Sequence, residues 1–176
     1  MSILAKVTLV LGGARSGKSR YAESLMAALQ PPWVYVATAE AGDAEMAERI
    51  AAHRARRGPN WHTIEALANL DRVLADHRSE PVLVDCLTLW LSKLLLDDGA
   101  LEDEMVRVEK SLLLATAPKI LVSNEVGAGV VPEHPLGRRF RDLQGVLNQR
   151  MAAIADRVVL MVAGLPLVMK GSLWAP

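Results

Sequence analysis

A phosphate-binding loop pattern near the N-terminus constrains the fold of this chain more than any other feature. Residues 12–19 read Gly-Gly-Ala-Arg-Ser-Gly-Lys-Ser, a full match to G-x-x-x-x-G-K-[ST]. An apolar, β-branched run at residues 7–11 precedes the loop, and a helical pattern at residues 19–29 follows it. This strand–loop–helix order directs backbone N–H groups and a helix N-terminus at an anion. The sequence therefore predicts a nucleoside triphosphate site.

Each part of the loop has a predicted task. Its glycines let the backbone curl around a phosphate, Lys18 supplies a mobile charge for the β- and γ-oxygens, and the Ser19 hydroxyl can ligate Mg²⁺. Lys18 is therefore a candidate catalytic residue. We expect nucleotide contacts from the whole loop, which comprises Gly12, Gly13, Ala14, Arg15, Ser16, Gly17, Lys18 and Ser19.

Apolar runs alternate with helical patterns along the chain. Strands are predicted at 6–11, 33–37, 81–86, 118–123 and 157–163, and helices at 19–29, 42–57, 67–77, 87–97, 101–116 and 136–155. Near-continuous apolar strands separated by helices are typical of a mostly parallel sheet that is covered on both faces. The predicted fold class is α/β, a three-layer P-loop NTPase-like fold. Ligands in such folds bind beyond the carboxyl ends of the strands, so the loops that leave those ends should converge.

Composition limits the class of protein. A chain of 176 residues suits one domain, here 1–176, and 51% apolar with 23% charged residues is ordinary for a globular protein. Because the formal net charge is zero, no overall electrostatic attraction favours binding to nucleic acid or to membrane surfaces. A single cysteine, Cys86, favours a reducing, cytoplasmic compartment. The apolar run at 158–169 is too short for a membrane span and contains Pro166, so it is interpreted as a strand and its exit.

An acidic residue ends one of the predicted strands. Asp85 follows Val82-Leu83-Val84, the layout of a carboxylate that holds Mg²⁺ together with the loop hydroxyl of Ser19. The alternative is a carboxylate that caps the next helix. The phosphate-binding loop favours the metal interpretation.

A basic segment follows the second predicted strand. Arg49, His53 and Arg57 are spaced i, i+4, i+8, so a helix places them on one face. Such a face is commonly a solvated surface, but arginine also suits polyphosphate. A histidine among arginines is biased toward its neutral, nucleophilic form. The histidines and the cysteine show no spacing typical of metal ligands.

A third polar segment runs from Asn124 to Arg150. Glycines follow the strand in 124–129, and the next helix carries several arginines. This is either a ligand-binding loop and helix or an ordinary surface loop before an amphipathic helix. Because no Asn-Lys-x-Asp motif is present, the base specificity does not follow from the residues.

Taken together, these segments resemble the bifunctional adenosylcobinamide kinase/adenosylcobinamide-phosphate guanylyltransferases of cobalamin biosynthesis. The resemblance covers nearly the whole chain. Its pieces are the loop 12–20, the segments 35–39, 45–50 and 85–88, the run from His53 through Arg57, Trp61 and Thr63 to Glu65, Asn124-Glu125-Val126-Gly127, Phe140-Arg141-Asp142, Asn148-Gln149, and 155–156 leading to Gly164.

The resemblance implies two reactions at one nucleotide site. The γ-phosphate of ATP or GTP passes to the aminopropanol hydroxyl of adenosylcobinamide, and GTP then reacts with a histidine, here His53, to give a GMP–histidine intermediate and pyrophosphate. The GMP passes to adenosylcobinamide phosphate, which gives adenosylcobinamide-GDP. The resemblance also implies Mg²⁺ and a homo-oligomer, typically a trimer. Outside the loop, the implied nucleotide-binding positions are Ala37, Thr38, Ala39, Arg54, Ala55, Arg56, Arg57, Glu65 and Asp85.

Two other functions remain open from the residues. One is a P-loop kinase of another small metabolite without guanylyltransferase activity, and the other is a nucleotide-binding regulatory module. The corrinoid-binding residues do not follow from the pattern, although the Arg138–Arg150 helix and the Asn124–Gly129 loop are candidates. The choice between ATP and GTP as phosphoryl donor also stays open.

Overall fold

One sheet organises the chain. The computed structural model describes residues 5–38, 57–66, 68–97 and 100–172. Within these ranges, a seven-stranded sheet has the order β3-β2-β4-β5-β1-β6-β7, and every neighbouring pair is parallel except β6 with β7. In chain order the strands are β1 (Val7–Gly12), β2 (Trp33–Ala37), β3 (Trp61–Glu65), β4 (Val82–Asp85), β5 (Lys119–Asn124), β6 (Arg157–Val162) and β7 (Leu165–Lys170).

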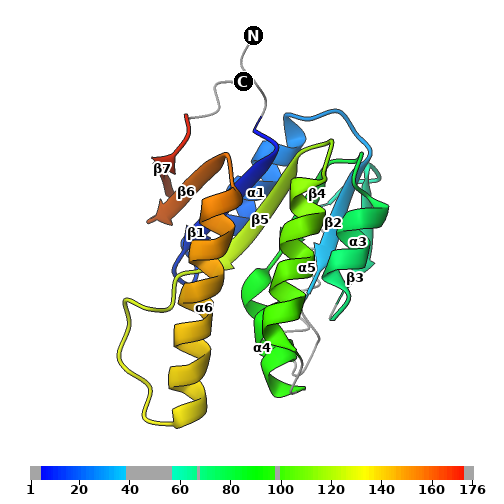
Figure 1. Cartoon of the computed structure of the whole chain (residues 1–176). Helices are drawn as coiled ribbons and strands as arrows, with labels where there is room; N and C mark the ends of the chain where they lie inside the picture. Colours follow the sequence, from blue (N-terminus) through cyan, green and yellow to red (C-terminus); the bar gives the residue numbers. More distant parts are fainter. Residues whose placement is uncertain (1–4, 39–56, 67, 98–99, 173–176) are drawn as a thin grey trace.

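Helices lie on both faces of the sheet, which confirms the predicted three-layer α/β fold (Figure 1). On one face, α1 (Lys18–Ala27) buries Ala22, Leu25 and Met26 against the sheet. The other face is covered by α3 (Leu70–Asp76), α4 (Leu87–Leu96), α5 (Leu101–Leu113) and α6 (Pro135–Ile154). Apolar burial on both faces explains why the central strands read as continuous hydrophobic runs.

The five predicted strands and most of the predicted helices are confirmed. The strand at 33–37 matches β2 residue for residue, and the other four predicted strands differ from the observed ones by at most one residue at each end. The predicted helices 19–29, 67–77, 87–97, 101–116 and 136–155 correspond to α1, α3, α4, α5 and α6. The predicted helix 42–57 lies outside the described residues except for Arg57, which is not helical.

Two strands were missed, and both lie at the edges of the sheet. β3 reads Trp-His-Thr-Ile-Glu and is only partly covered, so its hydrophobic signal is weak. β7 contains Pro166 and was interpreted as the exit from a strand. An edge strand tolerates proline because one side of its backbone needs no ladder partner. Within the described part of the chain, no helix is long and apolar enough to cross a membrane.

The strand order places the chemistry-bearing loops at one edge. β5 lies between β1, which leads into the phosphate-binding loop, and β4, which ends at Asp85. Because these strands are parallel, their carboxyl ends meet along the lower edge in Figure 1. The loops after β1, β4 and β5 therefore converge as predicted, and the described start of the loop after β2 joins them at Thr38.

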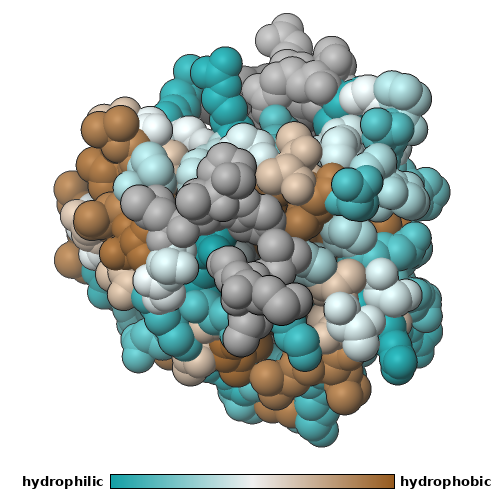
Figure 2. Space-filling view, turned by 90° about the horizontal axis from the view of Figure 1, so that it is seen from above, coloured by the Kyte–Doolittle hydropathy of each residue, from teal (hydrophilic) through white to brown (hydrophobic). Residues whose placement is uncertain are grey.

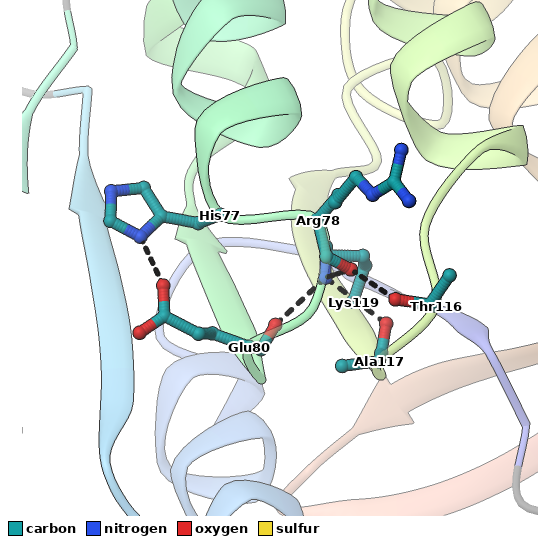
Figure 3. A network of polar contacts seen from close by, with 6 residues as sticks. All are labelled: His77, Arg78, Glu80, Thr116, Ala117 and Lys119. Carbon is teal, nitrogen blue, oxygen red and sulfur yellow. Dashed lines mark hydrogen bonds and ion pairs between the residues drawn. The ribbon is translucent and has the colours of Figure 1, made fainter.

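A buried lysine organises the opposite edge (Figure 3). Lys119 is fully buried at the start of β5, and its Nζ donates hydrogen bonds to the carbonyls of Glu80 at 2.8 Å, Ala117 at 3.0 Å and Arg78 at 3.2 Å. An ammonium has three donors, so all of them are used. Three loop carbonyls are thereby tied to one side chain, which holds the turn before β4 against the turn before β5.

The role of Lys170 follows from its contacts. Its Nζ donates to the carbonyls of Ala152 at 3.0 Å and Ala153 at 2.9 Å, in the last turn of α6. These carbonyls have no partner inside the helix, and a cation near a helix C-terminus is favourable. Lys170 therefore fastens the end of α6 to β7.

Candidate nucleotide site

The loop after β1 has the backbone that its glycines predict. Gly12 has a φ of 154°, and a Cβ at this position would lie 2.6 Å from the Met161 carbonyl oxygen. Gly17 adopts a φ of 95° and is the N-cap residue of α1. A side chain is excluded at Gly12 by sterics and disfavoured at Gly17 by conformation. The glycine spacing in the sequence is therefore a requirement of this turn.

Neighbouring loops hold the phosphate-binding loop at both ends. The Glu125 N–H donates to the Gly12 carbonyl at 3.0 Å, and the Gly164 N–H donates to the Ser16 carbonyl at 3.1 Å. The Ser16 hydroxyl is buried and makes no hydrogen bond to the described residues. Segments that are far apart in the sequence thus fix the loop before a ligand binds.

Lys18 lies inside the curled loop. Its side chain is buried, and Nζ donates to the Gly13 carbonyl at 2.6 Å. Burial lowers the pKa of Lys18, while the electrostatic influence of Cys86 and then Asp85 acts in the opposite direction. A cation that is already desolvated and aimed at the loop suits phosphate, because electrostatic attraction is stronger away from water.

Asp85 ends β4 at the same edge as the loop. Its Oδ2 accepts a hydrogen bond from the Tyr35 hydroxyl at 3.1 Å. The N-cap residue of α4 is Cys86, with no side-chain cap hydrogen bond, so the helix-cap alternative for Asp85 is not what the structure shows. The carboxylate faces the loop side of the sheet, since Leu83 two residues earlier packs in the α1-side core. This placement agrees with a metal-ligating role.

Tyr35 links Asp85 to the basic segment. The Arg57 guanidinium carbon lies 3.5 Å from the centre of the Tyr35 ring, a cation–π contact. Burial raises the pKa of Tyr35 well above its usual value, and Asp85 adds to the effect. The phenol therefore stays protonated and donates to Asp85. Tyr35 was not among the predicted site residues, although its place two residues before Ala37 on the same strand was the available signal.

The remaining predicted nucleotide-binding residues lie at strand ends, in hydrogen bonds within the protein, beside a cavity, or outside the described residues. Ala37, Glu65 and Asp85 end neighbouring strands in register, because Ala37 pairs with both of the others. Thr38 uses its hydroxyl within the protein: Oγ1 donates to the Cys86 carbonyl at 2.6 Å and accepts from the Cys86 N–H at 2.8 Å. Arg57 lines a cavity of about 270 Å³ beside α1 rather than the loop itself. Four predicted site residues lie outside the described residues, namely Ala39, Arg54, Ala55 and Arg56, as does the predicted nucleophile His53.

The arginine-bearing helix proposed for the corrinoid is partly engaged elsewhere. The Arg150 guanidinium donates to Glu109 at 2.5 and 3.0 Å and to Glu102 at 2.6 Å, so it joins α6 to α5. Arg138 donates to the carbonyls of Pro132 at 3.0 Å and Glu133 at 2.6 Å and thereby closes the loop before α6. Arg141 pairs with the neighbouring Asp142 at 3.2 Å. Arg138 and Arg150 thus contribute to the structure, and Arg139 is exposed on the same helix.

A glycine-lined anion loop with a buried lysine, next to an acidic strand end in a parallel sheet, defines a P-loop nucleotide-binding protein. A family model described as "Cobinamide kinase / cobinamide phosphate guanyltransferase" matches residues 8–169. The chain therefore belongs to the cobinamide kinase/cobinamide phosphate guanyltransferase family, as the sequence analysis expected.

Curated relatives agree with this assignment. The "Bifunctional adenosylcobalamin biosynthesis protein CobP" of Pseudomonas aeruginosa is 49% identical over 170 residues, which cover 93% of this chain and 96% of that protein. The "Bifunctional adenosylcobalamin biosynthesis protein CobU" of Escherichia coli is 40% identical, covering 92% and 98%. Among solved structures, a KaiC-like protein from Pyrococcus horikoshii is 14% identical with a TM-score of 0.48, covering 88% of this chain and 70% of that one. The family model and the two curated relatives confirm the prediction of a bifunctional enzyme of cobalamin biosynthesis at the level of the family.

Proposed function

We propose that this chain carries out both family reactions, kinase and guanylyltransferase, within the single domain 1–176. ATP or GTP donates the γ-phosphate to adenosylcobinamide in the first reaction, and GTP donates GMP to adenosylcobinamide phosphate in the second. The preformed phosphate-binding loop, with buried Lys18 held at the Gly13 carbonyl, carries the proposal. Both reactions need this one loop, since it holds the triphosphate whichever phosphorus is attacked.

The donor set at the carboxyl edge fits Mg²⁺. Ser19 lies in the first turn of α1 and is partly exposed, and Asp85 presents a carboxylate from β4. Within the described ranges, no group of three or more His, Cys, Asp or Glu side chains could hold a metal ion. A single carboxylate and a hydroxyl, completed by phosphate oxygens of the substrate, is the arrangement that Mg²⁺ accepts. When bound, Mg²⁺ supplies positive charge that stabilises the phosphoryl oxygens.

The guanylyl transfer is assigned to His53 on the resemblance. A ring nitrogen of His53 forms a bond to the α-phosphorus of GTP, the bond to the bridging oxygen breaks, and pyrophosphate leaves. A phosphate oxygen of adenosylcobinamide phosphate then attacks the same phosphorus, and the P–N bond breaks. Neutral His53 is regenerated and adenosylcobinamide-GDP is released. Two displacements replace one slow exchange, which is the usual advantage of covalent catalysis.

Labelled GTP tests the covalent route. Incubation with GTP labelled at the α-phosphate should give an acid-labile, alkali-stable adduct that disappears in His53→Ala, while this variant keeps its kinase activity. Absence of the adduct in the wild-type protein would favour a kinase of another metabolite. If Mg-GTP and cobinamide gave neither a phosphorylated nor a guanylylated corrinoid, the regulatory-module alternative would gain support.

An exposed apolar edge supports the proposed homo-oligomer. Figure 2 shows hydrophobic side chains gathered over the β6–β7 side of the molecule, where Val162, Leu165, Leu167 and Met169 are all more than half exposed. An uncovered apolar edge strand is a liability in a monomer, and such patches commonly mark interfaces. We expect self-association, with the trimer as the family-based expectation. Light scattering during size-exclusion chromatography measures it, and a monomer at micromolar concentration contradicts it. A cytoplasmic location, favoured by the lone cysteine, is part of the same proposal.

A further inference from the structure

Three buried polar side chains lie under the end of β5. Ser123, Gln144 and Asn148 are buried between β5 and α6. The Ser123 hydroxyl donates to Asn148 Oδ1 at 2.7 Å, and Gln144 Nε2 donates to Ser123 Oγ and to Asn148 Oδ1, both at 2.9 Å. Burying amides and hydroxyls in a core is costly unless they are bonded, and such networks fix a local geometry.

The network holds the backbone of Asn124. Asn148 Nδ2 donates to the Asn124 carbonyl at 3.0 Å. From the other side, the buried Thr88 hydroxyl of α4 accepts a hydrogen bond from the Asn124 N–H at 2.8 Å. Side chains of two different helices thus anchor both backbone polar groups of one residue at the end of a strand. The backbone of Asn124 is therefore anchored at the point where the chain leaves the strand for a loop.

Strand alternation determines where the Asn124 side chain lies. Ser123 points toward α6, and Ile120 and Val122 pack in the core cluster on the α1 side. Asn124 follows Val122 by two positions, so its carboxamide is on the α1 side, where the loop lies. Its register partner on β1 is Gly12, the first residue of the loop. No hydrogen bond joins this carboxamide to the described residues, although it is only partly exposed.

We infer that Asn124 is a catalytic residue of the kinase step, in which its carboxamide N–H donates to an oxygen of the γ-phosphoryl group. The inference rests on the proposed function. It is supported by the position of β5 between the loop strand and the Asp85 strand, which sets Asn124 beside the first residue of the phosphate-binding loop. In the reaction, the acceptor hydroxyl oxygen bonds to the γ-phosphorus and the bond to the bridging oxygen breaks. The nucleoside diphosphate leaves, and the hydroxyl proton goes to solvent. A donor fixed before reaction stabilises the charge on the transferring group without reorganisation.

The test compares Asn124→Ala with the matched control Asn60→Ala, which changes an exposed turn residue outside the site. Both are assayed with Mg-ATP and adenosylcobinamide. We expect Asn124→Ala to lower the kinase kcat about 100-fold, as loss of one preorganised donor does elsewhere. Its nucleotide KM should change less than about three-fold, and its adduct with α-labelled GTP should still form, because attack at the α-phosphorus does not use this contact. Asn60→Ala should match the wild-type protein.

Other outcomes overturn the inference. An unchanged kcat in Asn124→Ala, or a loss confined to nucleotide affinity, would make Asn124 a residue of the scaffold only. Asn124→Asp keeps the shape and removes the donor, so it carries the test if the alanine variant fails to fold, and an active Asn124→Asp protein would refute the role. A wild-type protein that phosphorylates no cobinamide would refute the proposed function, and the inference with it. An active wild-type protein with equally active Asn124 variants would refute the inference alone.

Discussion

Lys119 makes the stability of this protein depend on pH in a way that can be calculated. Burial lowers the pKa of Lys119 to about 8, with the Glu80 carboxylate acting in the opposite direction. In the unfolded chain the same amine titrates near 10.4. Between these two values the unfolded state binds more protons than the folded state, so the free energy of unfolding rises with pH across this window. Below pH 8 both states are protonated, and the contribution no longer changes.

The magnitude follows from the shift. One pKa unit corresponds to about 1.4 kcal/mol, so the contribution of Lys119 should grow by roughly 2–3 kcal/mol between pH 7 and pH 10. The variant Lys119→Met isolates this contribution because it keeps an unbranched side chain and removes the amine. Loss of the amine leaves the carbonyls of Glu80 and Ala117 without their donor, which costs about 1–3 kcal/mol each. At pH 7 the relief of a buried charge offsets much of that cost, and at pH 10 it no longer does.

Urea unfolding of both proteins, followed by tryptophan fluorescence at several pH values, measures the difference. We expect the destabilisation caused by Lys119→Met to be about 2–3 kcal/mol larger at pH 10 than at pH 7. Other groups that titrate in this range cancel between the two proteins. A difference that is constant from pH 7 to pH 10, or one that shrinks, would refute the reasoning.

Three further predictions concern the nucleotide site and the buried thiol of Cys86. Gly12→Ala should abolish nucleotide binding in isothermal titration, because its Cβ would lie 2.6 Å from both the Met161 carbonyl oxygen and the Ser16 hydroxyl; binding within ten-fold of wild type would contradict this. Lys18→Met should lower kinase and guanylyltransferase rates by at least about 100-fold, and a variant that loses only one activity would show that the loop is not shared. Burial raises the pKa of the Cys86 thiol to about 11, so it should resist iodoacetamide at pH 7.5 until urea unfolds the chain, as mass spectrometry can detect.

The parts of the fold that could be predicted are those that one segment specifies by itself. The central strands have mostly apolar sequences with polar residues chiefly at their ends, because both faces of the sheet are covered, and this pattern is visible in a window of about six residues. β3 and β7 have only a neighbour on one side, and their polar or proline-containing sequences carry no such signal. Whether these segments form strands depends on the exposed edge of the neighbouring strand, and the residues of the segment itself carry no information about that edge.

The candidate site also contains residues that the sequence could predict and residues whose role needed the structure. The loop from Gly12 to Ser19 was predictable because its glycines, lysine and serine are contiguous, and their spacing is a local demand of phosphate binding. The sequence also identified Asp85 as a candidate, but two interpretations stayed open until the structure placed its carboxylate against the Tyr35 hydroxyl.

By itself, then, the sequence determined the triphosphate loop, the layered parallel fold and, through resemblance, the family. Only the tertiary structure decided which distant residues surround that loop. It inserted β5 between the loop strand and the Asp85 strand, and it directed Thr88 and Asn148 onto the backbone of Asn124. These contacts join residues 24 and 36 positions apart, which no local periodicity connects. They form because α4 and α6 both pack on the same face of the sheet, which brings their side chains to the end of β5 whatever their separation along the chain.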